Sequence, residues 1–230
     1  MTARRAIILA DGGAPTRAGL DAAWPGWADG VDLVVAADGG ARLASRLGLR
    51  VDAWVGDGDS LGAAELEELR RAGVPITHAP ADKDESDAEL ALLAAIRAGA
   101  GEVTILGALG GPRLDHELAN LGLLAHPAAA RLAVRLLDDR ARVRLLTGPG
   151  PDGRPARLGL PGRVGDLVSL ITVEGATGVT TAGLRFPLHD EALPAGPARG
   201  LSNVRTAAAA WVSVRQGRIL VIEAPATLAE

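Results

Sequence analysis

The chain lacks several residue types that mark common protein classes. Its 230 residues include no cysteine, no tyrosine and a single phenylalanine. Without cysteine there is no disulfide framework and no thiolate zinc site, which fits a reducing cytoplasm. No apolar run approaches the roughly 20 residues of a membrane helix, and the short run after Arg5 meets Asp11 too early for a signal peptide. We therefore expect a soluble, cytoplasmic protein.

An excess of basic charge is also missing. The formal net charge is -4, whereas a protein that coats nucleic acid normally presents a basic face. Every basic residue is arginine except Lys83. What the chain has instead is 48% hydrophobic residues, enough to bury a core in one large or two smaller domains.

The first 124 residues alternate short aliphatic runs with longer periodic stretches rich in Ala and Leu. This alternation is typical of βαβ units on a parallel sheet and predicts a Rossmann-like, three-layer α/β domain. The predicted strands are 6–10, 32–36, 53–55, 76–78 and 103–106, and the predicted helices are 41–47, 63–72, 86–98 and 114–124.

The pattern changes after about residue 145. A Gly/Pro-rich stretch at 147–153 is followed by short strand-like runs without intervening helices, which predicts an antiparallel β-sandwich. We expect two domains, 1–146 and 147–230, although the runs 133–137 and 143–146 fit either side of the boundary. The predicted strands of the second domain are 167–173, 178–181, 184–188, 209–214 and 218–222.

Four acidic clusters follow predicted strands of the first domain, at 37–41, 56–60, 82–87 and 110–116. Open α/β sheets bind ligands at the carboxyl ends of their strands. Carboxylates gathered at one edge repel each other unless cations bind between them, which favours a hard-metal site. A phosphate-bearing substrate is the natural partner of such a site.

The second cluster places two carboxylates two residues apart. Asp57 and Asp59 would project to the same side of an extended segment and grip one Mg²⁺, while the neighbouring glycines let the backbone approach a ligand. The same residues are equally typical of an acidic turn in which Ser60 caps the next helix.

The third cluster has a structural and a functional interpretation. Ser86 and Glu89 fit a capping box, and acidic residues gain about 0.3–1 kcal/mol each at a helix N-terminus. Capping does not explain the density of charge at 82–87. Lys83 is placed to neutralise the carboxylates or to reach a phosphate, and Asp87 to complete the ligand set begun by Asp57 and Asp59.

In the fourth cluster, Gly110 and Gly111 would bring backbone N–H groups near a phosphate, with Arg113 as a forked donor. His116 and Asn120 share a helix face, but no HExxH pattern supports zinc. The stretches 11–13 and 38–40 are plain turn chemistry by themselves, and we expect the former to line a nucleotide pocket. Neither a GxGxxG fingerprint nor a P-loop is present.

The order of these motifs strongly resembles thiamine pyrophosphokinase, and the resemblance extends to 183–188 and 200–203 in the second half. It implies an α/β domain that binds ATP and Mg²⁺, a β-sandwich through which two subunits pair as a homodimer, and an active site between subunits. The implied reaction transfers the pyrophosphoryl group of ATP to the hydroxyethyl oxygen of thiamine, giving thiamine diphosphate and AMP.

The resemblance also implies roles for individual residues. Asp57, Asp59 and Asp87, with Asp38 nearby, would hold Mg²⁺, and Asp115 would orient or deprotonate the hydroxyl. The implied ATP-binding residues are Asp38, Ser60, Asp82, Lys83, Asp84, Gly110, Gly111, Arg113 and His116. The implied thiamine-binding residues are Asp38, Asp115, Asn120, Phe186, Ser202 and Asn203.

Phe186 stands where the family motif commonly carries Trp or Tyr, and a ring there would stack on the thiamine pyrimidine. Thiamine is a planar cation, so a ring face would contribute about 0.5–2 kcal/mol. The alternative for Phe186 is ordinary sandwich core. Two rival functions also stay open: a pyrophosphokinase acting on a hydroxymethylpterin, and a non-catalytic regulator that binds nucleotide and metal.

Overall fold

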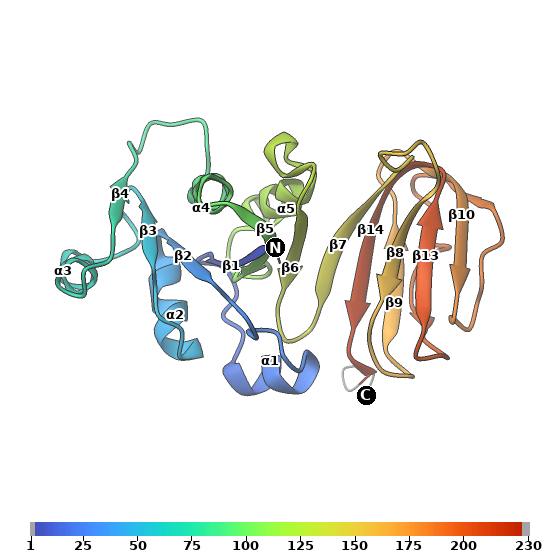
Figure 1. The fold of residues 1–230 in the computed structure, drawn as a ribbon, viewed down its shortest axis with the longest axis horizontal. Coiled ribbons are helices and arrows are strands. Elements are labelled where there is room, and N and C mark those ends of the chain that lie inside the picture. Colours follow the sequence, from blue (N-terminus) through green and yellow to red (C-terminus); the bar gives the residue numbers. More distant parts are fainter. Residues whose placement is uncertain (1–2, 227–230) are drawn as a thin grey trace. The chain divides into compact units, whose positions relative to one another are not determined.

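The computed structural model describes residues 3–226, and these form two compact units that meet between Asp139 and Arg140 in the sequence. In the first unit, six strands form one parallel sheet in the order β4-β3-β2-β1-β5-β6 (Figure 1). The strands are β1 (Arg4–Leu9), β2 (Leu33–Ala37), β3 (Ala53–Gly56), β4 (Ile76–His78), β5 (Ala100–Leu106) and β6 (Ala133–Leu137).

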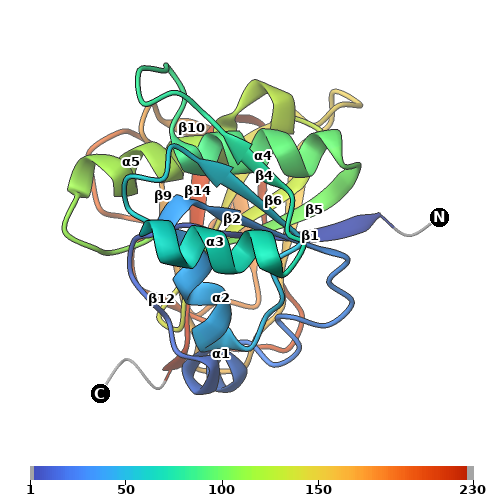
Figure 2. The ribbon, with the colours of Figure 1, turned by 90° about the vertical axis from the view of Figure 1, so that its left-hand side faces the viewer.

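Helices cover both faces of this sheet, as Figures 1 and 2 show for α1 and α2 on one side and α4 on the other. The predicted three-layer α/β arrangement is therefore confirmed. The helices are α1 (Arg17–Ala23), α2 (Ala41–Leu47), α3 (Ala63–Arg71), α4 (Asp87–Arg97) and α5 (Leu114–Gly122), with short 3₁₀ turns η1 (Asp38–Gly40), η2 (Leu123–Ala125) and η3 (Pro127–Ala129).

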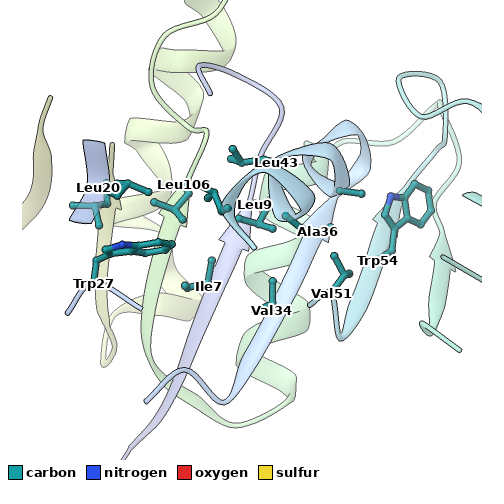
Figure 3. Close-up of a cluster of buried hydrophobic side chains, with 14 of the residues drawn as sticks. Ile7, Leu9, Leu20, Trp27, Val34, Ala36, Leu43, Val51, Trp54 and Leu106 are labelled. Atoms are coloured by element: carbon teal, nitrogen blue, oxygen red, sulfur yellow. The ribbon is translucent and has the colours of Figure 1, made fainter. Parts of the chain in front are cut away.

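The core on the α1/α2 side is built from alternate residues of the central strands. Ile7 and Leu9 of β1 and Val34 and Ala36 of β2 pack against Leu43 and its helical neighbours (Figure 3). The adjacent strand residues, such as Ile8, point to the opposite face, where α4 packs its alanines and Leu92. This alternation is the period-two pattern of a strand buried on both faces.

In the second unit, antiparallel strands enclose a separate apolar core that includes Leu146, Val179, Val212, Ile219 and Val221. This agrees with the expected sandwich. Its strands are β7 (Arg142–Gly148), β8 (Ala156–Leu160), β9 (Leu167–Ile171), β10 (Ala176–Ala182), β11 (Glu191–Leu193), β12 (Asn203–Val204), β13 (Ala210–Val214) and β14 (Gln216–Ala224). Strand β7 pairs with β14, so the expected limit at residue 146 falls inside a strand of this unit.

One predicted strand was wrong. Residues 184–188 form a loop with an isolated bridge between Leu184 and Arg205. The loop is held instead by the side chain of Asn203, whose Oδ1 accepts from the Phe186 N–H at 3.0 Å while its Nδ2 donates to the Phe186 carbonyl at 2.7 Å. An amide that satisfies both backbone groups of a residue takes the place of a strand ladder.

No helix within residues 3–226 combines the length and the apolar composition needed to cross a membrane.

Candidate active site

A cavity of about 750 Å³ opens at the carboxyl edge of the parallel sheet. Its lining comes from the segments that follow β1, β2, β3, β4 and β5, as expected for an open α/β sheet. The predicted site residues that line it are Asp38, Asp57, Asp59, Ser60, Lys83, Asp84, Asp87, Gly110, Arg113, His116 and Asn120.

Other predicted residues of this unit lie outside the lining. Asp82, Gly111 and Asp115 are exposed and do not contribute to the cavity wall. Conversely, Asp11 and Gly12 line it, as expected for the loop after the first strand. Glu117 also lines it, and sequence reasoning missed this residue because it lies one helical position beyond the recognisable motif.

Asp38 is the most deeply buried carboxylate of the cavity, with 3% of its surface exposed. It begins η1 in a left-handed conformation, φ 44°, and the indole Nε1 of Trp54 donates to its carbonyl at 3.0 Å. Trp54 is fully buried, so it acts as a support behind the site rather than as a wall of it. A Cβ on Gly56 would lie 2.9 Å from the Asp38 Cβ, which explains the glycine at the end of β3.

Carboxylate oxygens of Asp38, Asp57 and Asp59 lie within 4.8 Å of one another. At that separation two like charges repel by roughly 3–4 kcal/mol at an effective dielectric near 20. Burial raises the pKa of Asp38, and the neighbouring Asp59 carboxyl acts in the same direction, against the hydrogen bonds from Ser60. Among residues 3–226, Asp38 Oδ1 is buried without a hydrogen-bond partner.

Asp57 has a more favourable environment. It accepts from the backbone N–H of Asp59 at 3.1 Å and from the Lys83 ammonium at 3.0 Å, and these two contacts, in that order, lower its pKa. The same ammonium lies 3.3 Å from Asp87 Oδ1, where burial outweighs the lysine and raises the pKa of Asp87. Lys83 therefore bridges Asp57 and Asp87, although Asp87 is not among the carboxylates whose oxygens lie within 4.8 Å of one another.

Hard divalent cations prefer clustered carboxylate oxygens, and an unpartnered buried oxygen on Asp38 is a position that a cation would satisfy. The residues present fit Mg²⁺. Asp38, Asp57 and Asp59 are close enough to share one ion. Lys83 holds Asp87 beside them.

The N-termini of the helices around the cavity show which of the expected capping roles of Ser60, Ser86 and Glu89 are present. Ser86 caps α4 by accepting from the Glu89 N–H at 3.2 Å. Glu89 does not complete a capping box and instead lies 3.2 Å from Nε2 of His126. Ser60 does not cap α3, since the N-cap residue is Gly62. Instead, the Ser60 N–H donates to Asp38 Oδ2 and its hydroxyl donates to Asp59 Oδ1, each at 3.0 Å.

Asp115 forms an ion pair with Arg113. Arg113 Nε and Nη2 donate to its two carboxylate oxygens at 2.9 and 2.5 Å, and this fork is the main reason that the pKa of Asp115 is well below its usual range. A carboxylate with a lowered pKa is a weaker base. Asn120, one turn further into α5, is buried and donates to the Ala108 carbonyl at 3.0 Å.

The three predicted residues of the second unit lie near one another, with Asn203 buried and Phe186 and Ser202 exposed. Phe186 is 62% exposed, so it is not ordinary sandwich core. Asn203 fixes its backbone, and the Arg185 guanidinium carbon lies over its ring at 5.7 Å from the centroid. Ser202 is left-handed, φ 54°, and its N–H donates to Ser169 Oγ at 3.0 Å.

Comparisons with known proteins agree with this arrangement. The family model "Thiamin pyrophosphokinase, catalytic domain" matches residues 26–136, and the model "Thiamin pyrophosphokinase, vitamin B1 binding domain" matches residues 158–219. The first range includes the carboxylate group and the second includes Phe186 and Asn203. The chain belongs to the thiamine pyrophosphokinase family.

Individual relatives carry the same name. The chain is 28% identical to thiamine pyrophosphokinase of Bacillus subtilis (strain 168) over 120 residues, a match that spans 52% of this chain and 56% of that protein. The crystal structure of thiamine pyrophosphokinase from Bacillus subtilis superposes with a TM-score of 0.81 at 23% identity, covering 96% of this chain and 99% of that one.

A thiamin pyrophosphokinase family protein from Enterococcus faecalis superposes with a TM-score of 0.78 at 27% identity, covering 96% of this chain and 99% of that one. The fold of the thiamine pyrophosphokinase family is therefore present along nearly the whole chain.

Proposed function

We propose that this chain is an ATP-dependent thiamine diphosphokinase. The observation that carries the proposal is the group of carboxylate oxygens from Asp38, Asp57 and Asp59 within 4.8 Å, in a cavity large enough for a nucleotide tail. Both models of the thiamine pyrophosphokinase family support the assignment. In the reaction, the thiamine hydroxyl oxygen attacks the β-phosphorus of ATP, the bond between the α- and β-phosphoryl groups breaks, and AMP and one proton leave.

In this proposal Asp57, Asp59 and Asp38 hold Mg²⁺, and Asp87 completes the set. When bound, the ion would neutralise the phosphates and polarise them for attack. The protein's own contribution is to keep the carboxylates together before any ligand arrives. The Asp59 backbone N–H on Asp57 and the Ser60 contacts to Asp38 and Asp59 do this.

We assign the nucleotide to the rest of the cavity. Lys83, Arg113 and the backbone at Gly110 and Gly111 would bind phosphate oxygens, and His116 and Ser60 lie on the same lining. The resemblance also assigns ATP binding to Asp82 and Asp84, of which Asp84 lines the cavity and Asp82 does not. Transfers of this kind depend mainly on positioning and charge stabilisation, so the weak basicity of the paired Asp115 is compatible with an orienting role for it.

We assign thiamine to Phe186, Ser202 and Asn203, with Asp38, Asp115 and Asn120 completing its contacts. The ring of Phe186 is exposed and its backbone is fixed, so it offers a ready stacking face for a planar cation. Homodimerisation, with the active site between subunits, belongs to the same proposal and rests on the family resemblance. A cytoplasmic location stays a prediction from the cysteine-free sequence.

The decisive experiment is AMP formation from ATP and Mg²⁺ with thiamine as acceptor, beside the variant Phe186→Ala. Loss of the ring should raise KM for thiamine roughly 2- to 30-fold, the range of a cation–π contact, with KM for ATP unchanged. Val173→Ala is the matched control, because Val173 is another exposed apolar side chain of the second unit.

Two outcomes would replace the proposal. AMP formation with a hydroxymethylpterin but not with thiamine would assign the acceptor to the pterin class. Binding of ATP and Mg²⁺ without AMP formation with either acceptor would indicate a regulator.

A further inference from the structure

Arg42 lies in the first turn of α2, outside the lining of the cavity. Its Nε and Nη2 each donate to one carboxylate oxygen of Glu65 at 2.6 Å, which is the two-pronged geometry that makes arginine–carboxylate pairs directional. The same Nη2 also donates to the backbone carbonyl of Ser60 at 2.9 Å. One guanidinium therefore holds a helix start and a loop at once.

Glu65 holds the other end of that loop, at Gly62. Its Oε2 accepts from the backbone N–H of Gly62 at 3.0 Å, which closes the N-terminus of α3. The contact with Arg42, followed by this N–H, lowers the pKa of Glu65 and keeps it ionised at neutral pH. Arg42 and Glu65 thus fix the loop from Ser60 to Gly62 on both sides.

Ser60 connects this pair to the carboxylate group. Its carbonyl is held by Arg42, while its N–H donates to Asp38 and its hydroxyl donates to Asp59. Two of the three clustered carboxylates are therefore oriented by a residue whose own position depends on Arg42. Neither Arg42 nor Glu65 belongs to the acidic clusters or to the lining of the cavity.

We propose that Arg42 and Glu65 are a positioning pair for the metal site, acting through Ser60 to set the spacing of Asp38 and Asp59. This inference rests on the proposed function only in taking the carboxylate group as the Mg²⁺ site.

The direction in which Mg²⁺ affinity changes when Arg42 is removed distinguishes a positioning role from a purely electrostatic one. A positive side chain near a cation site repels the cation, so its removal by itself raises affinity for Mg²⁺. If Arg42 positions the carboxylates, its removal lowers the affinity instead. Arg46 is the matched control, because it lies one turn further along α2 and also acts on the charge of Asp11, yet the structure gives it no hydrogen bond to the loop.

The experiment titrates the full chain with Mg²⁺ alone, by calorimetry and by competition with Mn²⁺, in the parent, Arg42→Met and Arg46→Met. Loss of a partner that orients a metal ligand costs 10- to 100-fold in affinity, and we expect about tenfold weaker binding for Arg42→Met because the effect passes through the backbone of Ser60. Arg46→Met should bind Mg²⁺ as tightly as the parent or more tightly.

Glu65→Gln provides the second arm. It also weakens the site electrostatically, so Glu68→Gln, an exposed glutamate of the same helix, is its charge control. The double variant Arg42→Met/Glu65→Gln should bind Mg²⁺ no more weakly than the weaker single variant, since the two residues act as one unit. The melting temperature in chelator should change little, because exposed ion pairs contribute about 0.2–1 kcal/mol.

Equal or tighter Mg²⁺ binding by Arg42→Met overturns the proposal, as does a parent protein that binds neither Mg²⁺ nor Mn²⁺. If Arg42→Met does not fold, Glu65→Gln decides: it must bind Mg²⁺ more weakly than Glu68→Gln. The titration uses neither ATP nor thiamine, so failure of the AMP assay would leave this result standing and would refute only the proposed reaction.

Discussion

Each unit contains a cluster of charged side chains, and the balance of positive and negative charge differs between the two clusters. In the second unit, Glu223 is 2% exposed and both of its carboxylate oxygens are paired, with Arg142 at 2.7 and 2.9 Å, Arg144 at 2.5 Å and Arg205 at 3.6 Å. In the first unit, the Lys83 ammonium pairs with Asp57 and Asp87, and Asp57 is the one member of the group of Asp38, Asp57 and Asp59 that it contacts.

The difference shows which charges serve the fold and which serve a ligand. The carboxylate of Glu223 is saturated, and the side-chain atoms still without partners among the described residues of this cluster belong to Arg144 and Arg205, whose pKa values are lowered by burial. In the first unit, the described carboxylate oxygens that are buried without a hydrogen-bond partner belong to Asp38 and Asp87, and both residues line the cavity. A buried anion without partners invites a cation, whereas a saturated one does not.

The largest loss of stability is expected when the buried cluster around Glu223 is disrupted. Glu223→Ala leaves three arginines without their shared anion and should destabilise the protein by about 3–5 kcal/mol, as measured by chemical unfolding. Glu191→Ala, which breaks an exposed pair with Arg199, should cost no more than about 1 kcal/mol. Equal losses in the two variants would mean that burial does not distinguish these pairs.

Disrupting the carboxylate group of Asp38, Asp57 and Asp59 should instead lower enzymatic activity. Asp57→Asn should lower kcat by about 10²–10³, the range seen when one electrostatic group is lost from a preorganised site. Its melting temperature should stay within a few degrees of the parent, because the amide oxygen can still accept from the Asp59 N–H. A well-folded Asp57→Asn protein with full activity would refute the metal assignment.

The variant Lys83→Met tests how far one cation compensates the carboxylates of the first unit, because it removes the ammonium that bridges Asp57 and Asp87. In chelator the variant should melt several degrees below the parent, since two partly buried carboxylates lose their partner. Mg²⁺ alone should raise its melting temperature by more than it raises that of the parent. The opposite order in scanning calorimetry would show that Lys83 does not compensate these charges.

The smallest effect concerns pH. Burial raises the pKa of Asp38 in the folded protein, so the folded state favours its protonated form. The stability from this group is complete below the unfolded pKa of about 4 and is lost as the pH rises through the raised folded value. Asp38→Asn in chelator should therefore exceed the parent in stability near neutral pH, and the advantage should shrink as the pH falls toward 4. A pH-independent difference in unfolding free energy would contradict this.

The sequence predicted the parallel sheet well because its strands are short aliphatic runs between strongly periodic helices. Helix α1 was not predicted, since its seven residues include Gly19 and Asp21 and show little periodicity. It is stabilised by a local N-cap, in which Thr16 Oγ1 accepts from the Gly19 N–H, and by a tertiary contact in which Trp24 donates to the Asp138 carbonyl. The strand predicted at 184–188 was wrong because a distant side chain, Asn203, occupies its backbone groups.

For the site, the carboxylates were predictable because each follows a strand, and strand ends meet at one edge of a parallel sheet. Arg42 was not predictable. It lies inside an ordinary helical pattern, and its partners Ser60 and Glu65 are 18 and 23 residues away along the chain. The metal and nucleotide roles of the individual residues are predictions that the experiments above test.

The arrangement at Phe186 has a directional consequence. A benzene ring has two sides, and the Arg185 guanidinium carbon lies over one of them at 5.7 Å from the centroid, while Asn203 holds the backbone that carries the ring. A flat, positively charged guest would meet less repulsion on the opposite side, away from this like charge. Under the proposed function, thiamine would approach the ring face opposite Arg185. Thiamine analogues with bulky groups directed at that face should then bind most weakly.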